Sequence, residues 1–387
     1  MSRPPRGLTA TSLLLLVTML ASFTPTPLYP AYRQEWGLGD AEISWVFAGY
    51  PLGVMVVLVA LGGMSDRIGR VPTLRLGAGL LIAAMAVLAS APSLEALVAG
   101  RLLQGAATGL VTGAGAAALM DLHPRGTGAG TSRTTLMLAT GLAIGPLLAG
   151  QATARLPGPL VTPYVLTIVL LLVPFTALVA LGSSRPERTT PARLLAPIRV
   201  PRSILVPVGI AAASVATTNA TFAMLGSYGP DVVARAASSS SPGVAGAFVS
   251  SILVLVAVVQ VLARGPRVVL MAVGAATTAA GWGAVTLAAA LREPAVLVAA
   301  VPLLGVGAGL GLHASAGHVG AVSPPERRAE IYSAYLLSAF VALAASAFGL
   351  GAVVEAQGIT AAAATATGVC AGLTVLVALG LLPRRSR

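Results

Sequence analysis

The chain has 387 residues, of which 56% are hydrophobic and 9% are charged, and its formal net charge is +12. Soluble domains carry about 25% charged residues, so this composition excludes a water-soluble globular protein. All 24 basic residues are arginines and most lie in short connections between apolar runs, which favours a topology signal over a nucleic-acid-binding patch. The single cysteine, Cys370, excludes an intrachain disulfide. The sequence also lacks a Cys/His cluster of the kind that binds zinc.

Unbroken apolar runs of helix-spanning length predict membrane-crossing α-helices rather than barrel strands. The first run follows Arg3 and Arg6 and is too long for a cleaved signal peptide, so we expect it to be retained. Twelve spans are predicted, at residues 8–30, 42–63, 73–93, 95–119, 132–153, 160–183, 204–227, 243–263, 267–290, 294–318, 328–352 and 358–383.

The longest polar stretch, residues 183–203, carries five arginines and separates the sixth span from the seventh. The sequence therefore predicts an all-α membrane protein with two six-helix halves, residues 1–183 and 204–387, joined by a linker at 184–203. With the N-terminus inside, nineteen arginines lie on the inner side and four on the outer side. This bias predicts cytoplasmic termini in a cell membrane, which we expect to be a bacterial cytoplasmic membrane.

The two halves share a faint internal repeat. "RIGRVPTLRLGAG" at 67–79 aligns with "RGPRVVLMAVGAA" at 264–276, which pairs Arg67 with Arg264 and Gly77 with Gly274. "TGL" at 108–110 likewise aligns with "AGL" at 308–310. Chance similarity in a chain rich in Ala, Gly and Val is the alternative explanation.

A cluster of glycines and charges lies between the second and third spans, at Gly62, Asp66, Arg67, Gly69 and Arg70. Asp66 and Arg70 are one turn apart if the segment is helical, and Gly69 permits a tight turn. Simple anchoring of the topology is the alternative, but it explains neither the acid nor the glycine.

This spacing resembles the G-x-x-x-D-R-x-G-R motif between helices two and three of the major facilitator superfamily, although Val71 departs from the basic residue common there. The resemblance implies transport by alternating access between two six-helix halves. It also implies that Asp66 and Arg70 help to latch the halves together. The expected docking partner is the start of the eleventh helix, near Glu330.

The fourth span contains "RLLQGAATG" at 101–109. An arginine inside a membrane span is costly and is a functional-site hypothesis by default. Arg101, Gln104 and Gly105 resemble the R-x-x-Q-G motif of the family's fourth helix, whose arginine is associated with proton transfer or coupling. The alternative is that Arg101 extends to the outer interface.

The fifth span contains "GLAIGPLLAG" at 141–150. Gly141, Gly145, Pro146 and Gly150 resemble a fifth-helix motif associated mainly with exporters, although Ala149 replaces a common glycine. Gly141 and Gly145 also form a small-xxx-small face, and Pro146 is expected to bend the helix. Helix packing alone is the alternative explanation.

Groups for substrate and proton are harder to find. By these spans none of the twelve acids lies deep in the membrane, and Asp231 falls outside. His313 and His318 are alternative titratable groups. Polar side chains within spans suggest a substrate cavity that includes Tyr50, Asn219, His313 and Tyr335, and "TTNAT" at 217–221 is the densest such cluster.

We therefore expect a monomeric exporter of small hydrophobic or cationic compounds, working by proton antiport in the lipid bilayer. It would need no cofactor beyond the proton gradient and would bind no metal or nucleic acid. An importer or facilitator of a sugar or another metabolite is the alternative. An enzyme or a receptor is disfavoured, because the sequence suggests neither a catalytic cluster at one membrane face nor a soluble output domain.

Overall fold

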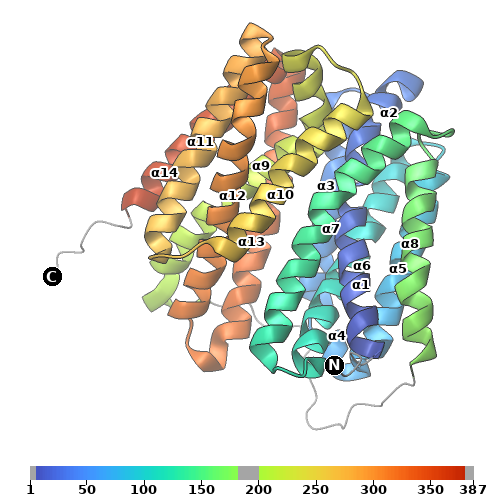
Figure 1. Ribbon diagram of the computed structural model, residues 1–387. Helices are drawn as coiled ribbons and strands as arrows, with labels where there is room; N and C mark the ends of the chain where they lie inside the picture. The colour runs from blue at the N-terminus through green and yellow to red at the C-terminus, as the bar shows by residue number, and fades with distance from the viewer. Residues whose placement is uncertain (1–5, 182–199, 380–387) are drawn as a thin grey trace. The chain divides into compact units, whose positions relative to one another are not determined.

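The computed structural model describes residues 6–181 and 200–379 (Figure 1). Within these ranges the regular elements are all helical, and twelve helical segments are long and apolar enough to cross a membrane. Most of the predicted linker at 184–203 lies outside the described residues, as do Arg3 and the last four residues of the twelfth predicted span. Further arginines of the predicted inner side also lie outside them: Arg185, Arg188, Arg193, Arg199, Arg384, Arg385 and Arg387.

The helices follow one another with short connections. The first six spans comprise α1 Arg6–Ser22, η1 Thr26–Leu28, α2 Tyr29–Trp36, α3 Asp40–Ala60, α4 Met64–Ile68, α5 Arg70–Ala89, α6 Leu94–Leu122, α7 Thr127–Arg155 and α8 Thr162–Ala180. The last six comprise η2 Arg202–Ile204, α9 Leu205–Ala237, α10 Pro242–Leu262, α11 Arg267–Leu291, α12 Pro294–Val322, η3 Pro325–Arg327, α13 Arg328–Gln357 and α14 Ile359–Leu379.

The chain divides into two compact units. Unit 1 contains Met1–Gly37 and Trp45–Ala196, and unit 2 contains Leu38–Ser44 and Pro197–Arg387. In unit 1 the densest helix packing joins α5 to α6 and α1 to α7, and in unit 2 it joins α11 to α12 and α14. The first turn of α3 is thus grouped with unit 2, while the rest of that helix belongs to unit 1.

The first predicted span is wrong as a single helix. α1 ends at Ser22, and the chain passes through a turn and η1 before it resumes a helical course in α2. Pro25 and Pro27 explain the break, because neither residue has a backbone N–H with which to continue the helix. The candidate membrane span nevertheless continues to Trp36, further than the sequence pattern indicated.

The seventh predicted span is too short. α9 continues through Pro230 to Ala237, whereas the sequence pattern predicted a span that ends at residue 227. Asp231 therefore lies in the last turns of α9, near the end of a candidate membrane span, rather than in a loop. The other ten predicted spans agree with the helices to within five residues at the described ends.

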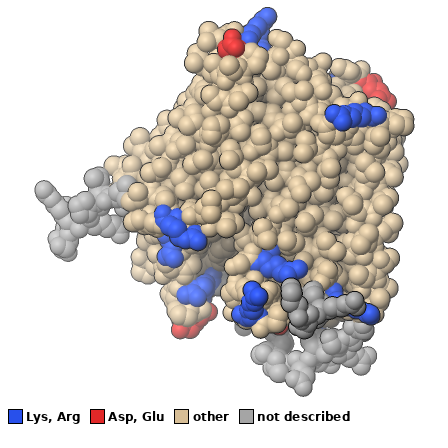
Figure 2. All heavy atoms as spheres, viewed as in Figure 1, with Lys and Arg blue, Asp and Glu red and all other residues tan. Residues whose placement is uncertain are grey.

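The surfaces of both units suit a lipid environment. Large apolar side chains project outward, including Val56 at 61% exposure, Val173 at 58% and Val298 at 69%. On the face drawn in Figure 2 the broad middle is uncharged, and the charged side chains gather toward the ends of the helices. Such apolar surfaces are stable in lipid, because the backbone N–H and C=O groups form their hydrogen bonds within the helices.

Equivalent helix contacts recur in the two units. A Cβ atom added at Gly109 would lie 3.0 Å from Val57 Cβ, and one added at Gly309 would lie 2.8 Å from Val259 Cβ. Gly105 on α6 likewise faces the carbonyl of Tyr50, as Gly305 on α12 faces that of Ile252. The two units therefore share a pattern of close glycine contacts at these positions.

Candidate functional site

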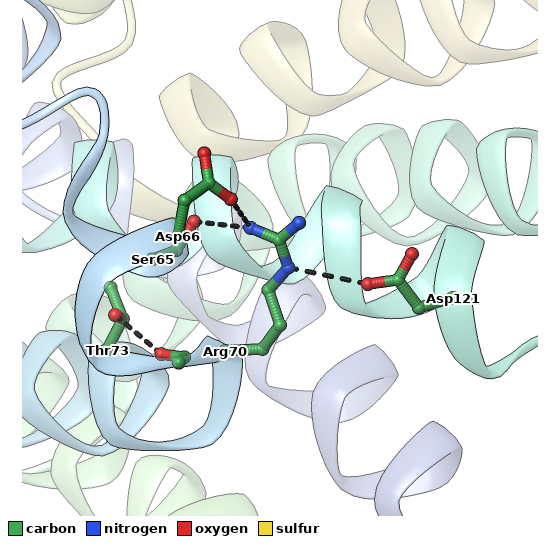
Figure 3. Close-up of polar contacts among 6 residues, drawn as sticks. Ser65, Asp66, Arg70, Thr73 and Asp121 are labelled. Atoms are coloured by element: carbon green, nitrogen blue, oxygen red, sulfur yellow. Dashed lines mark hydrogen bonds and ion pairs between the residues drawn. The ribbon is translucent and has the colours of Figure 1, made fainter. Parts of the chain in front are cut away.

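The charged cluster after α3 forms a connected group in unit 1. Gly69 separates α4 from α5 with a φ of 98°, a left-handed conformation that glycine adopts without strain. Arg70 Nη1 donates to Ser65 Oγ at 2.7 Å and also to Asp66. Arg70 Nε lies 3.4 Å from Asp121 Oδ2 near the end of α6, so the guanidinium bridges the two carboxylates (Figure 3).

The expected pair between Asp66 and Arg70 is present, although the segment is not one continuous helix. The pair spans the break at Gly69 between two helices. Asp121 was missed as a partner, although its place near the end of the fourth span was a usable signal. Gly62 lies in the turn before α4, and Arg67 is exposed on α4.

The proposed docking of Asp66 near Glu330 involves both units and remains a prediction. Within unit 2, Glu330 accepts a hydrogen bond from Arg327 Nε at 3.0 Å. This hydrogen bond from the guanidinium to the Glu330 carboxylate raises the pKa of Arg327. The start of α13 thus has its own ion pair.

Arg101 is buried inside unit 1, with a relative exposure of 1%. Its Nε donates to the Val46 carbonyl at 3.2 Å, and its Nη1 donates to the Ser22 carbonyl at 3.1 Å. Nη2 lies 3.5 Å from the Phe47 carbonyl oxygen. These partners come from α1 and α3, so the arginine of α6 joins three helices.

Side chains complete the surroundings of Arg101. Nη1 also donates to Gln104 Oε1, and Gln104 Nε2 in turn donates to the Ala21 carbonyl at 2.6 Å. The guanidinium carbon lies 5.1 Å from the centroid of the Tyr50 ring, a cation–π distance. The described acceptors of Arg101 are thus carbonyl oxygens, including that of an amide, and the alternative that this arginine extends to the interface is wrong.

Small residues allow the helices around Arg101 to approach closely. A Cβ atom at Gly105 would lie 2.0 Å from the Tyr50 carbonyl oxygen, a distance that no side chain could occupy. This contact brings Gly105, Tyr50 and Arg101 into one buried group. The sequence motif therefore corresponds to a packed three-helix junction.

The fifth-helix motif lies where α7 packs on α1. A Cβ atom would lie 2.0 Å from the Leu16 carbonyl oxygen at Gly141, and 2.4 Å from that of Leu20 at Gly145. Pro146 and Gly150 are also buried, and α7 continues past Pro146 to Arg155. The two glycines thus set the approach of α7 to α1, and their connection with export remains a prediction.

The cavity residues proposed in the second half have different partners. Tyr335 OH lies 2.8 Å from Ser315 Oγ, and Asn219 Nδ2 donates to the Val215 carbonyl of its own helix at 3.2 Å. His313 Nδ1 lies 3.0 Å from the Gln260 carbonyl oxygen on α10. Tyr335 is also part of an apolar cluster. The role of these residues in binding a substrate remains a prediction.

Asp231 is the titratable group that the sequence interpretation missed. It lies six residues before the end of α9 at Ala237, and its Oδ2 atom is buried. The signal that could have identified it is the apolar "VVARAA" stretch that follows, which is compatible with a continuing helix. Among the described residues, no group of three or more His, Cys, Asp or Glu side chains could hold a metal ion.

In the part of the chain that the structure describes, twelve apolar helical segments and a buried arginine junction define a multi-pass helical membrane protein. The sequence profile of the Major Facilitator Superfamily matches residues 11–264, about two thirds of the chain. The chain belongs to this superfamily.

Curated relatives match over shorter stretches. A "Probable multidrug-efflux transporter" of Mycobacterium tuberculosis is 32% identical over 129 residues, which are 33% of this chain and 27% of the relative. The lincomycin resistance protein of Streptomyces lincolnensis is 32% identical over 124 residues, 32% of this chain and 26% of that protein. The matched stretches therefore span only about a quarter of these relatives.

Solved structures resemble the fold over nearly the whole chain. A peptide transporter aligns with a TM-score of 0.79 at 15% identity, covering 97% of this chain and 93% of its own. A bacterial homologue of the human lysosomal transporter Spinster also aligns with a TM-score of 0.79, at 13% identity and 98% coverage of both chains. At such low identity the similarity demonstrates a common fold.

Proposed function

We propose that this protein exports small hydrophobic or cationic compounds across a bacterial cytoplasmic membrane by proton antiport. The observation that carries the proposal is the charged and polar junction around Arg101, buried within spans of a chain that belongs to a transporter superfamily. Ionisable groups in such positions are costly and mark substrate or ion pathways.

Export rather than import is supported by the relatives and by the fifth helix. The names of two matched relatives refer to multidrug efflux and to lincomycin resistance. The close contacts of Gly141 and Gly145 with α1 occur at the motif that resembles those of exporters. Import or facilitation of a sugar or another metabolite is the alternative, and uptake by whole cells would distinguish the two directions.

Transport would proceed by alternating access, as one six-helix half moves against the other and exposes a site to each side in turn. As the family resemblance implies, the Asp66 and Arg70 cluster would help to latch the two halves during this motion. We place the Arg70 cluster on the cytoplasmic side, with both termini. The protein would work as a monomer in the lipid bilayer, without a cofactor.

Asp231 is the group we propose to carry the proton. A carboxylate releases and rebinds a proton, whereas a guanidinium stays charged in proteins, so Arg101 cannot itself be the carrier. The burial of Asp231 Oδ2 supports this assignment. The proposed function predicts that loss of the carboxyl group at this position removes the response to a proton gradient.

The test of this function is drug resistance of cells that overproduce the protein. Strains lacking their own exporters would be challenged with ethidium and with lincomycin, and the minimum inhibitory concentration would be measured. We expect it to rise at least severalfold for one of them, and the same strain should accumulate less of that compound. An unchanged inhibitory concentration for both, with the protein present in the membrane, would contradict export of these compounds.

A further inference from the structure

The main-chain carbonyl groups around Arg101 differ in whether a helical N–H is available to them. In an α-helix each carbonyl normally accepts from the N–H four residues later, and its second lone pair can also accept from a side chain. Arg101 and Gln104 bond to main-chain oxygens of α1 and α3. An oxygen that lacks its helical donor has the greater need of such a partner.

Proline explains the acceptors at the end of α1. The carbonyl of Ala21 would pair with the N–H of residue 25, but residue 25 is proline and has none. Ala21 instead accepts from Thr24 N and from Gln104 Nε2. The next carbonyl, that of Ser22, loses its helical donor because Thr26 N turns to Phe23 at 3.2 Å, and it accepts from Arg101 instead.

A second proline has the same effect in α3. The carbonyl of Phe47 would pair with the N–H of residue 51, which is Pro51, inside the helix. A helical proline also displaces the carbonyl four residues before it, because its ring clashes with that oxygen. The displaced oxygen is the one that faces Arg101 Nη2 at 3.5 Å.

We propose that Pro25 and Pro51 are positioning residues that leave main-chain carbonyls without a helical donor, so that these carbonyls accept from Arg101 and Gln104. The guanidinium thereby keeps the turn after α1 packed against α3. Pro51 leaves the Phe47 carbonyl for Arg101, and the break at Pro25 leaves that of Ser22, whereas the Val46 carbonyl accepts from Arg101 without a proline four residues later. Gln104 connects the arginine to the Ala21 carbonyl. We call Arg101, Gln104, Pro25 and Pro51 the carbonyl clasp. The clasp has no counterpart in the second half, because the equivalent glycine contacts of the two units align Val301 with Arg101.

The clasp predicts a specific non-additivity that can be measured without knowing the substrate. Replacing Pro51 by Ala restores an N–H for the Phe47 carbonyl. In the native protein this N–H competes with Arg101, whereas in an Arg101→Met background it satisfies an oxygen that has lost its partner. Pro51→Ala should therefore be more favourable in the Arg101→Met protein than in the native one.

The experiment measures the apparent melting temperature of the full chain, purified in detergent, for the native protein, both single variants and the double variant. We expect the shift caused by Pro51→Ala to be more positive in the Arg101→Met background by on the order of 2 °C. Pro174→Ala is the matched control, because its restored N–H faces the Leu170 carbonyl within α8. This control should give the same shift in both backgrounds. Equal shifts for Pro51→Ala would overturn the proposal.

A second cycle covers the possibility that Arg101→Met protein does not accumulate. Gln104→Met removes the donor to the Ala21 carbonyl, and Pro25→Ala supplies an N–H to the same oxygen. Pro25→Ala should be more favourable in the Gln104→Met background than in the native protein. Amide hydrogen exchange of peptides covering residues 21–28 should be slower in the double variant than in the Gln104→Met protein. Additive melting shifts together with unchanged exchange would overturn the proposal.

Discussion

Gly105 lies directly against the main chain of Tyr50: a Cβ atom at position 105 would come within 2.0 Å of the Tyr50 carbonyl oxygen. Since backbone is the obstacle, α6 would have to move away from α3 to admit even a methyl group. We therefore expect Gly105→Ala to destabilise the protein by about 3 kcal/mol, at the upper end of typical overpacking costs. Thermal unfolding in detergent would measure this loss.

Gly113 provides a control on the same helix, because nothing lies within 4 Å of a Cβ atom added there. Gly113→Ala should be neutral or stabilising, since alanine favours helix more than glycine does. An equal loss of stability from both substitutions would mean that the contact with Tyr50 is not what selects glycine at position 105.

The glycines of α7 should matter in the same way for its contact with α1. Gly141→Ala would place a methyl group 2.0 Å from the Leu16 carbonyl oxygen, so we expect reduced stability and a severalfold loss of efflux. Gly128→Ala in the same helix has open space around it and should retain activity. If Gly141→Ala transports normally, the close approach of α7 to α1 is not needed for transport.

Asp66→Asn separates gating from stability. The Asp66 and Arg70 side chains are 54% and 34% exposed, so the pair should contribute only about 0.2–1 kcal/mol to folding. If the pair latches a transport state, turnover should fall several-fold while the affinity for a bound compound changes little. Asp121→Asn, which removes the other carboxylate of Arg70, is the comparison. Unchanged turnover in Asp66→Asn would remove the latch from the mechanism.

The sequence predicted the features that depend on residues close together along the chain. Hydropathy located all twelve spans, and the spacing of glycines and charges indicated the cluster at Gly69 and the junction at Arg101. Proline did not predict reliably where a helix ends. Pro25 breaks the first span, whereas Pro230 is accommodated within α9, and the difference depends on the packing around each residue rather than on the residue itself.

Contacts between distant segments could not be predicted from the pattern. Asp121 reaches Arg70 only because α6 ends beside the start of α5, and the acceptors of Arg101 come from helices that are 55 and 79 residues away. Side-chain direction was equally hidden. Asn219 and His313 were grouped as cavity residues by polarity alone, but their hydrogen bonds lead to different helices.

Asp231→Asn tests the proposed role of Asp231 in proton antiport. With the carboxyl group removed, we expect exchange of a substrate across the membrane to continue, while its accumulation no longer follows an imposed pH gradient. Glu355→Gln, at an exposed acid near the end of α13, is the control and should leave the response to the gradient intact. A normal gradient response in Asp231→Asn would assign the proton to another group.

The most direct test of proton antiport is transport by the purified protein in proteoliposomes under an imposed proton gradient. Ethidium and lincomycin would be the probes, and a collapsed gradient would serve as the reference. Under proton antiport, at least one probe should move against the direction of proton flow, and this movement should be lost when the gradient is collapsed. Movement that is the same with and without the gradient, for each probe transported, would contradict proton antiport.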